Sequence, residues 1–161
     1  MKDIYNVQQQ YRKLKYSYHP EITANLTKEE GGKKSKGWIP AEIKWEKDSL
    51  EEMVKSHSYI PSKLKNGHKI KENVEEVYFL TLDFDKNDPT LEQFKENWKN
   101  TQFSWFLHTT VNHQKTKNDQ EEIVEPKDRF RVIIPLSRPI TLKELDEMEE
   151  YWVEKFPLID K

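Results

Sequence analysis

The nonapeptide VYFLTLDFD, residues 77–85, decides the fold because it joins an apolar run to an acidic end. Its β-branched and aromatic residues predict a buried strand. The tripeptide Asn-Asp-Pro at 87–89 is typical of a turn, so we expect the strand to run out into a loop. Asp83 and Asp85 would then lie where a buried strand meets the surface.

Four further elements follow this strand. Residues 90–100 carry apolar side chains at helical spacing behind a Thr-x-x-Gln capping box, which predicts a short amphipathic helix. Residues 103–110 (FSWFLHTT) and 129–136 (RFRVIIPL) predict two more strands, and the polar stretch 114–128 between them predicts an exposed, mobile loop. A second amphipathic helix is expected after Thr141.

The order β-α-β-β-α predicts an α+β fold, in which an antiparallel-rich sheet carries helices on one face, like the RRM-type half of many nucleic-acid enzymes. We expect an N-terminal extension or subdomain, residues 1–74, packed on an RRM-like unit, residues 75–161. A fourth strand is expected to begin near Leu158, so the second unit would be truncated at its C-terminus.

Composition limits the class of protein. A chain of 161 residues is long enough for one domain with a core, and its five Trp, seven Tyr and seven Phe supply large side chains to bury. The absence of cysteine excludes disulfides, thiolate zinc sites and catalytic thiols. No signal peptide or membrane-spanning stretch is recognisable, so we expect a cytoplasmic protein without a membrane partner.

The charge is distributed unevenly along the chain. Residues 1–74 hold 15 Lys and Arg against 10 Asp and Glu, a net charge of +5, whereas residues 75–161 hold 12 against 19, a net charge of −7. The basic half could lie along a polyanion, but solvated lysines give the same pattern. On charge alone we prefer the second interpretation.

The Asp-x-Asp sequence is the sharpest chemical feature. Side chains two residues apart on a strand share a face, so Asp83 and Asp85 would present neighbouring carboxylates. A divalent cation relieves the repulsion between such charges, and oxygen ligands favour Mg²⁺ or Mn²⁺. The alternative is that the acids only mark the polar end of a strand. The tripeptide is common, and glycosyltransferases also use it.

Other polar residues could complete this site. Asp160 follows two apolar residues at another expected strand start and is the candidate third metal ligand. His108 and His113 flank a turn after the second strand, where an imidazole could contact a triphosphate. Arg129 and Arg131 alternate on the third strand and could hold phosphate oxygens, or they could pair with an acid on a neighbouring strand.

Five segments occur in a set order: residues 59–67, Asp-Phe-Asp at 83–85, HTTVNH at 108–113, RFRVIIPLSRP at 129–139, and Ile-Asp at 159–160. This series resembles the primase-polymerase branch of the archaeo-eukaryotic primase superfamily, of the type encoded by phages, plasmids and other mobile elements. The resemblance covers roughly residues 58–161.

The resemblance implies a nucleotidyltransferase that acts as a DNA primase or DNA polymerase with two divalent metals, Mg²⁺ or Mn²⁺. Asp83, Asp85 and Asp160 would be the metal ligands. His113 is our candidate for the family's catalytic histidine, and His108, His113, Arg129 and Arg131 would bind the nucleotide. The expected partners are nucleoside triphosphates, a DNA template with its primer and, as a further candidate, a replicative helicase.

Two alternatives share these residues. The chain could be a replication-initiation or nucleic-acid-binding module that keeps the fold without turnover, as an isolated fragment of the catalytic core would. It could also be a metal-dependent nuclease that uses the same acids. Nucleotide incorporation that is lost on replacing Asp83 would distinguish the nucleotidyltransferase from the non-catalytic module. Shortening of the nucleic acid would identify the nuclease.

Overall fold

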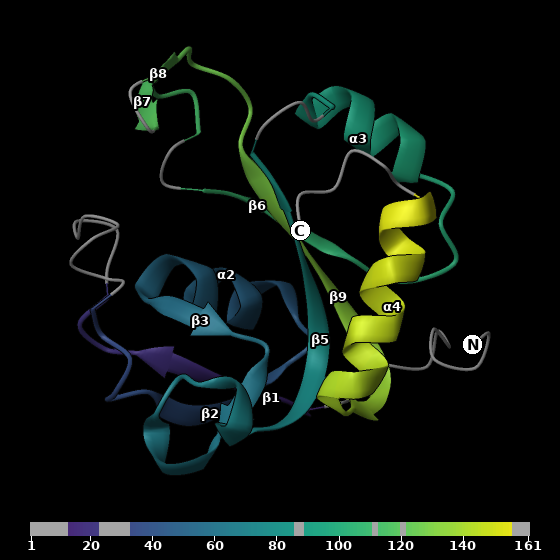
Figure 1. The fold of residues 1–161 in the computed structure, drawn as a ribbon. Helices are drawn as coiled ribbons and strands as arrows, with labels where there is room; N and C mark the ends of the chain where they lie inside the picture. The colour runs from purple at the N-terminus through teal and green to yellow at the C-terminus, as the bar shows by residue number, and fades with distance from the viewer. Residues whose placement is uncertain (1–12, 23–32, 86–88, 111–112, 120–121, 156–161) are drawn as a thin grey trace.

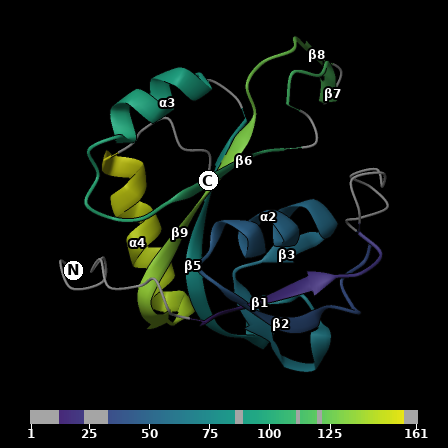
Figure 2. The same ribbon diagram turned by 180° about the vertical axis from the view of Figure 1, so that it is seen from behind.

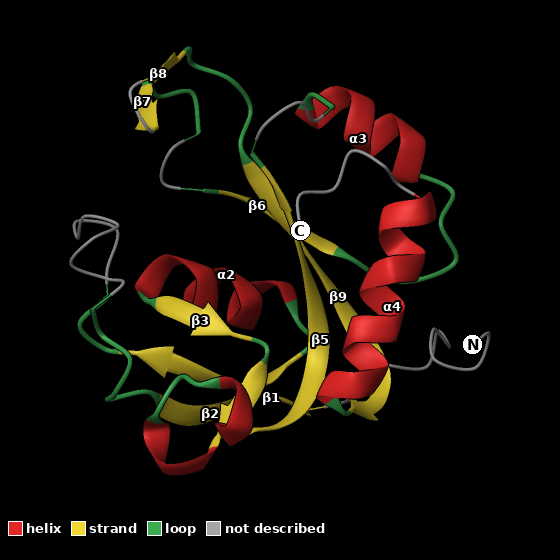
Figure 3. Cartoon of the chain, viewed as in Figure 1, coloured by secondary structure: helices red, strands yellow, loops and turns green. Residues whose placement is uncertain are grey.

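The computed structural model describes residues 13–22, 33–85, 89–110, 113–119 and 122–155. The elements in this part of the chain are β1 (Lys13–His19), β2 (Ile39–Lys44), α2 (Lys47–Ser56), β3 (Ser58–Ile60), β4 (Ser62–Leu64), the 3-10 turns η2 (Lys65–Gly67) and η3 (Lys71–Asn73), β5 (Val74–Phe84), α3 (Leu91–Trp98), β6 (Phe106–Thr109), β7 (Lys117–Asp119), β8 (Glu122–Val124), β9 (Phe130–Ile140) and α4 (Leu142–Lys155). They form an α+β fold, as the sequence predicts (Figure 3).

The central sheet has the strand order β4-β5-β9-β6, and its neighbouring strands are antiparallel. Since β5 and β6 both pair with β9, they run parallel to each other, and α3 connects them. This is a split β-α-β arrangement within the predicted β-α-β-β-α order. The closer comparison with an RRM remains a prediction.

The two faces of the central sheet pack against different layers. Even-numbered residues such as Leu82 and Val132 form a core with α3 and α4. Odd-numbered residues, Phe79 and Ile133 among them, form a second core with β1, β3 and α2. Figures 1 and 2 show these layers on opposite sides of β5 and β9. The period of two along each strand therefore decides which side chains meet the N-terminal half.

The N-terminal half contains a three-stranded antiparallel sheet with the order β2-β1-β3. The expected unit boundary at residue 74 falls at the start of β5, yet β4, which precedes it, is a strand of the central sheet. The two expected units therefore share one sheet. The N-terminal half was expected only as an extension or subdomain, and β1 and β2 were not predicted, although alternating apolar and polar residues run through Lys13–His19.

Some expected boundaries were wrong for physical reasons. β9 continues past Pro135 to Ile140, because Ile140 is buried in the core and pairs with Val77. β6 pairs with β9 only as far as Ile133. Among the described strands, the part of β9 that contains Pro135 and Pro139 therefore has β5 as its one neighbour, and proline is tolerated at such an edge. The stretch 114–128, expected to be a loop, contains the β7–β8 hairpin.

Both predicted helix caps are present. The Thr90 side chain accepts a hydrogen bond from the backbone of Gln93, whose side chain accepts one from the backbone of Thr90. Thr141 and Glu144 make the same reciprocal contacts at the start of α4. Among the described residues no helix is long and apolar enough to cross a membrane.

Candidate functional site

Strand alternation places the two acids on the face of β5 that looks toward the N-terminal half. Leu82 and Phe84 point into the core beneath the helices, so Asp83 and Asp85 point the other way. The predicted shared face of the acids is consistent with this pattern. The structure also gives each acid a cation, Arg131 of β9 for Asp83 and Arg129, directly before β9, for Asp85. Pairing with an acid was the alternative interpretation of the two arginines.

Asp83 forms a two-pronged ion pair with Arg131, its register partner on β9. Arg131 Nε donates to Asp83 Oδ1 at 2.5 Å and Nη2 donates to Oδ2 at 2.8 Å. Burial alone would lower the pKa of Arg131, but hydrogen bonding to Asp83 raises it above the ordinary value. The guanidinium lies 5.5 Å from the ring centroid of Tyr59, a cation–π contact from β3. The Asp83–Arg131 pair is therefore anchored to both halves of the molecule.

His108 lies on the other side of Arg131, because β6 pairs His108 with that residue. Its Nδ1 is 3.0 Å from the carbonyl oxygen of Thr109, which can only accept a hydrogen bond, so we assign the ring proton to Nδ1. Nε2 then accepts from the Tyr59 hydroxyl at 2.9 Å. Burial is the main cause that lowers the pKa of His108, and it also raises the pKa of Tyr59 to about 12. Both groups are neutral near pH 7.

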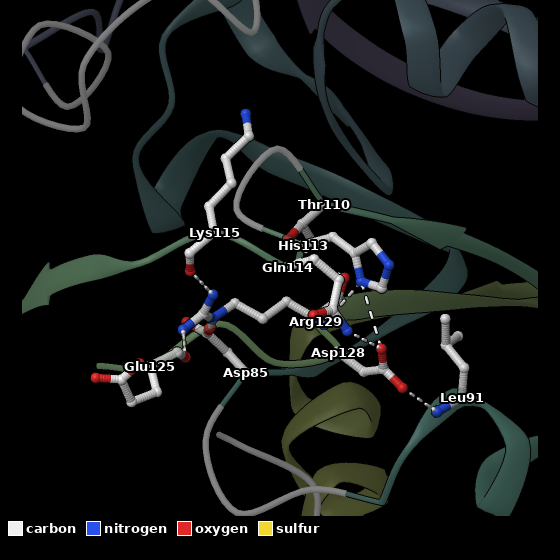
Figure 4. Close-up of polar contacts among 9 residues, drawn as sticks. All are labelled: Asp85, Leu91, Thr110, His113, Gln114, Lys115, Glu125, Asp128 and Arg129. Atoms are coloured by element: carbon white, nitrogen blue, oxygen red, sulfur yellow. Dashed lines mark hydrogen bonds and ion pairs between the residues drawn. The ribbon is translucent and has the colours of Figure 1, made fainter. Parts of the chain in front are cut away.

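Arg129 is almost completely buried, with 1% of its side chain exposed, and it faces Asp85 (Figure 4). Its Nε lies 2.8 Å from Asp85 Oδ1. The same guanidinium donates to the carbonyl oxygens of Lys115 at 2.6 Å and Glu125 at 3.4 Å. These two residues lie at the base of the β7–β8 hairpin. Arg129 therefore connects the acid at the end of β5 to the hairpin.

His113 belongs to a neighbouring group around Asp128. His113 Nδ1 accepts a hydrogen bond from the backbone of Arg129 at 3.2 Å and lies 3.9 Å from Asp128 Oδ1. Asp128 accepts from the backbone of Leu91 at 2.8 Å and from Gln114 at 2.6 Å (Figure 4). The Leu91 hydrogen bond is the main cause that lowers the Asp128 pKa. Asp128 thus holds the start of α3 against the segment that leads into β9.

The sequence analysis missed Asp128 and Tyr59. The only local signal for Asp128 is an acid directly before the strand RFRVIIPL, and its partners lie far away in the sequence. Tyr59 begins the segment 59–67 on which the resemblance partly rests, and nothing in that segment indicates a partner 49 residues away. Asp160 lies outside the described residues, so its predicted role as a third ligand stays a prediction. Within the described part of the chain, no three His, Asp or Glu side chains are placed to hold a metal ion.

Comparison with known proteins gives one family. The family model of the VapE N-terminal domain matches residues 41–155, which include α2, the central sheet and all the candidate residues except Asp160. Neither the curated proteins nor the solved structures contain a significant match.

Arg129 and Arg131 should differ in their effect on stability when each is replaced by methionine. We expect Arg129→Met to lower the free energy of unfolding by about 3 kcal/mol, because it removes a buried cation that faces an acid and two carbonyls. Arg131→Met should cost about 1 kcal/mol, since the Asp83 side chain is 46% exposed and water can solvate it. Urea unfolding measures both values. Faster hydrogen exchange of residues 113–119 and 122–125 is expected only in Arg129→Met, and equal exchange in both variants would contradict the hairpin role.

The lowered pKa of His108 predicts a pH dependence of stability. The unfolded chain binds a proton at this histidine below the ordinary value of 6.5, whereas the folded chain resists that proton. The stabilising contribution is therefore present above pH 6.5 and is lost as the pH falls below it. Wild type should lose more unfolding free energy between pH 7 and pH 5 than His108→Gln. A His108 pKa at or above 6.5 by NMR would rule this out.

Proposed function

This chain belongs to the VapE N-terminal domain family, and we propose that it carries out metal-dependent nucleotidyl transfer in the replication of a mobile genetic element. The family is associated with primase-like proteins of phages and plasmids, which supports a replication-related role. The observation that carries the proposal is the placement of Asp83 and Asp85 on one face at the end of β5, where Asp83 faces Arg131 of β9 and Asp85 faces Arg129, the residue directly before β9. The substrates would be nucleoside triphosphates and the 3'-hydroxyl of a templated DNA or RNA strand.

The acids fit a divalent cation by donor type. One or two protein carboxylates together with substrate phosphates are a usual ligand set for Mg²⁺. Asp83 and Asp85 supply two carboxylates with exposed fractions of 46% and 34%, and Asp160 would be the third ligand. When bound, Mg²⁺ or Mn²⁺ would supply charge stabilisation for the displacement at the α-phosphate.

In this proposal Arg131 changes partners when the substrate binds. Its guanidinium is held by Asp83 in the structure, and a triphosphate with its metal brings an anion for Arg131 and a cation for Asp83. The pair can therefore separate without leaving either charge uncompensated. A guanidinium binds phosphate through the same two-pronged geometry that it uses with a carboxylate. Arg129, which is buried and bound to the hairpin carbonyls, would instead position Asp85.

Of the two histidines, His113 is the better candidate for the phosphates. Its Nδ1 accepts the backbone N–H of Arg129, so its Nε2 carries the proton and can donate it to an anion. Both ring nitrogens of His108 already have partners within the protein. His108 would act through Tyr59, which lies against Arg131.

A second candidate function is nucleic-acid binding without turnover. The observation that favours it is that each acid already has a cation within the protein, so the repulsion that would attract a metal is reduced. A module of this kind would keep the fold and its ion pairs as structural elements.

The test is incorporation of a labelled nucleotide on a primed DNA template with Mg²⁺ or Mn²⁺. We expect wild type to extend the primer, and Asp83→Asn to lose about a hundredfold or more in rate, as for other groups that stabilise transition-state charge. Asp48→Asn, the same change at an exposed residue of α2, is the matched control and should retain full activity.

Each other result has a defined meaning. Incorporation by Asp83→Asn at the wild-type rate would refute catalysis at this site. Binding of DNA without incorporation by wild type would support the non-catalytic module. Shortening of the labelled strand, lost in Asp83→Asn, would identify a nuclease.

A further inference from the structure

Two lysine-rich segments of the N-terminal half, residues 33–38 and 63–71, lie side by side; we call them the lysine loops. The backbone N–H of Lys69 donates to the carbonyl oxygen of Ser35 at 2.6 Å, and a β-bridge joins the loops one residue away. The second loop includes the last two residues of β4 and all of η2, at the end of the molecule remote from β7 and β8 (Figures 1 and 2). The two loops therefore form one surface.

The conformation of this surface depends on residues with left-handed backbone angles. Asn66 and Gly67 have φ values of 54° and 60°. A Cβ at Gly67 would lie 2.5 Å from the carbonyl oxygen of Trp38, whose N–H donates to the carbonyl oxygen of Gly67 at 3.0 Å. A residue with a side chain would therefore force the loops apart. Trp38, the last residue of the first loop, is itself buried, so it is not free to stack on a ligand.

The lysine loops contain seven lysines and no acidic residue: Lys33, Lys34, Lys36, Lys63, Lys65, Lys69 and Lys71. Acids from outside the loops pair with three of them, Lys34, Lys63 and Lys71. Lys36, Lys65 and Lys69 are exposed and form no ion pair with another described residue. The Lys69 ammonium lies 5.1 Å from the ring centroid of Trp38, a cation–π contact that joins the two loops.

We propose that the lysine loops bind the phosphodiester backbone of a nucleic acid. A set of ammonium groups on two fixed loops matches a row of phosphates, which lysines contact without reading sequence. The chain as a whole carries a net charge of −2, so this surface differs in sign from the average of the molecule. The choice of nucleic acid over an acidic protein rests on the proposed replication function.

This surface is distant from the acids. β4, in the second loop, pairs Leu64 with Val74 at the start of β5, whereas Asp83 lies near the other end of that strand. Nine residues of strand span roughly 30 Å at about 3.3 Å per residue. Changes in the lysine loops should therefore leave the Asp83–Arg131 pair intact.

The experiment compares the triple variant K36Q/K65Q/K69Q with wild type by fluorescence anisotropy on a labelled 20-nucleotide strand and on the matching duplex, across a range of salt concentrations. Loss of three phosphate contacts should reduce the salt slope of log K by about 2 for the single strand and about 3 for the duplex. Affinity at low salt should fall at least tenfold. K95Q/K99Q/K143Q, which removes the same charge from α3 and α4, is the matched control, and K36R/K65R/K69R should restore binding.

The proposal is overturned if wild type does not bind either form at low salt, or if the two glutamine triple variants lose affinity equally. It is also overturned if poly-glutamate of equal charge competes as well as DNA, which would indicate an acidic protein partner. Loop-dependent DNA binding in a wild type that fails to incorporate nucleotide would leave this inference standing while the proposed catalysis fails.

Discussion

The ion pair between Asp83 and Arg131 across β5 and β9 is the interaction on which the geometry of the candidate site depends. It forms only in one register, because a slip of either strand by one residue would turn the charged side chain of that strand toward the helix-covered core and away from its partner. His108 on β6 is the register partner of Arg131 on the side away from Asp83, and Tyr59 on β3 contacts both Arg131 and His108. One row of polar residues thus crosses three strands and joins the central sheet to the N-terminal half.

A second pair, Asp85 with Arg129, has a different character. Arg131 keeps 30% of its side chain exposed, whereas Arg129 is buried and also holds the β7–β8 hairpin. The first pair is suited to exchange partners with an incoming anion, and the second is suited to keep an acid and a hairpin in place. Two arginines only two residues apart in the sequence therefore have separate structural roles, which follow from their different burial.

The sequence predicted the α+β class, both helix caps and three strands of the central sheet, β5, β6 and β9, because period and capping are local signals; the short strand β4 was not predicted. It also predicted that Asp83 and Asp85 share a face. It left open whether Arg129 and Arg131 face phosphate or an acid, since that depends on which strand lies beside β9. The sequence did not predict the contacts of Tyr59 with His108, of Asp128 with Leu91, or between the two lysine loops. Each of these contacts joins residues that are distant in the chain. The proposed ligand Asp160 lies outside the described residues.

Exchange of partners at Arg131 is the central claim, and NMR of the arginine Nε–H groups tests it most directly. On adding a non-hydrolysable nucleoside triphosphate together with Mg²⁺, the Arg131 resonance should shift as its contact with Asp83 is replaced by phosphate, while the Arg129 resonance should change little. The triphosphate or Mg²⁺ alone should have a much smaller effect, because either would leave one charge of the pair uncompensated. An unchanged Arg131 resonance at saturating triphosphate and Mg²⁺ would contradict the account.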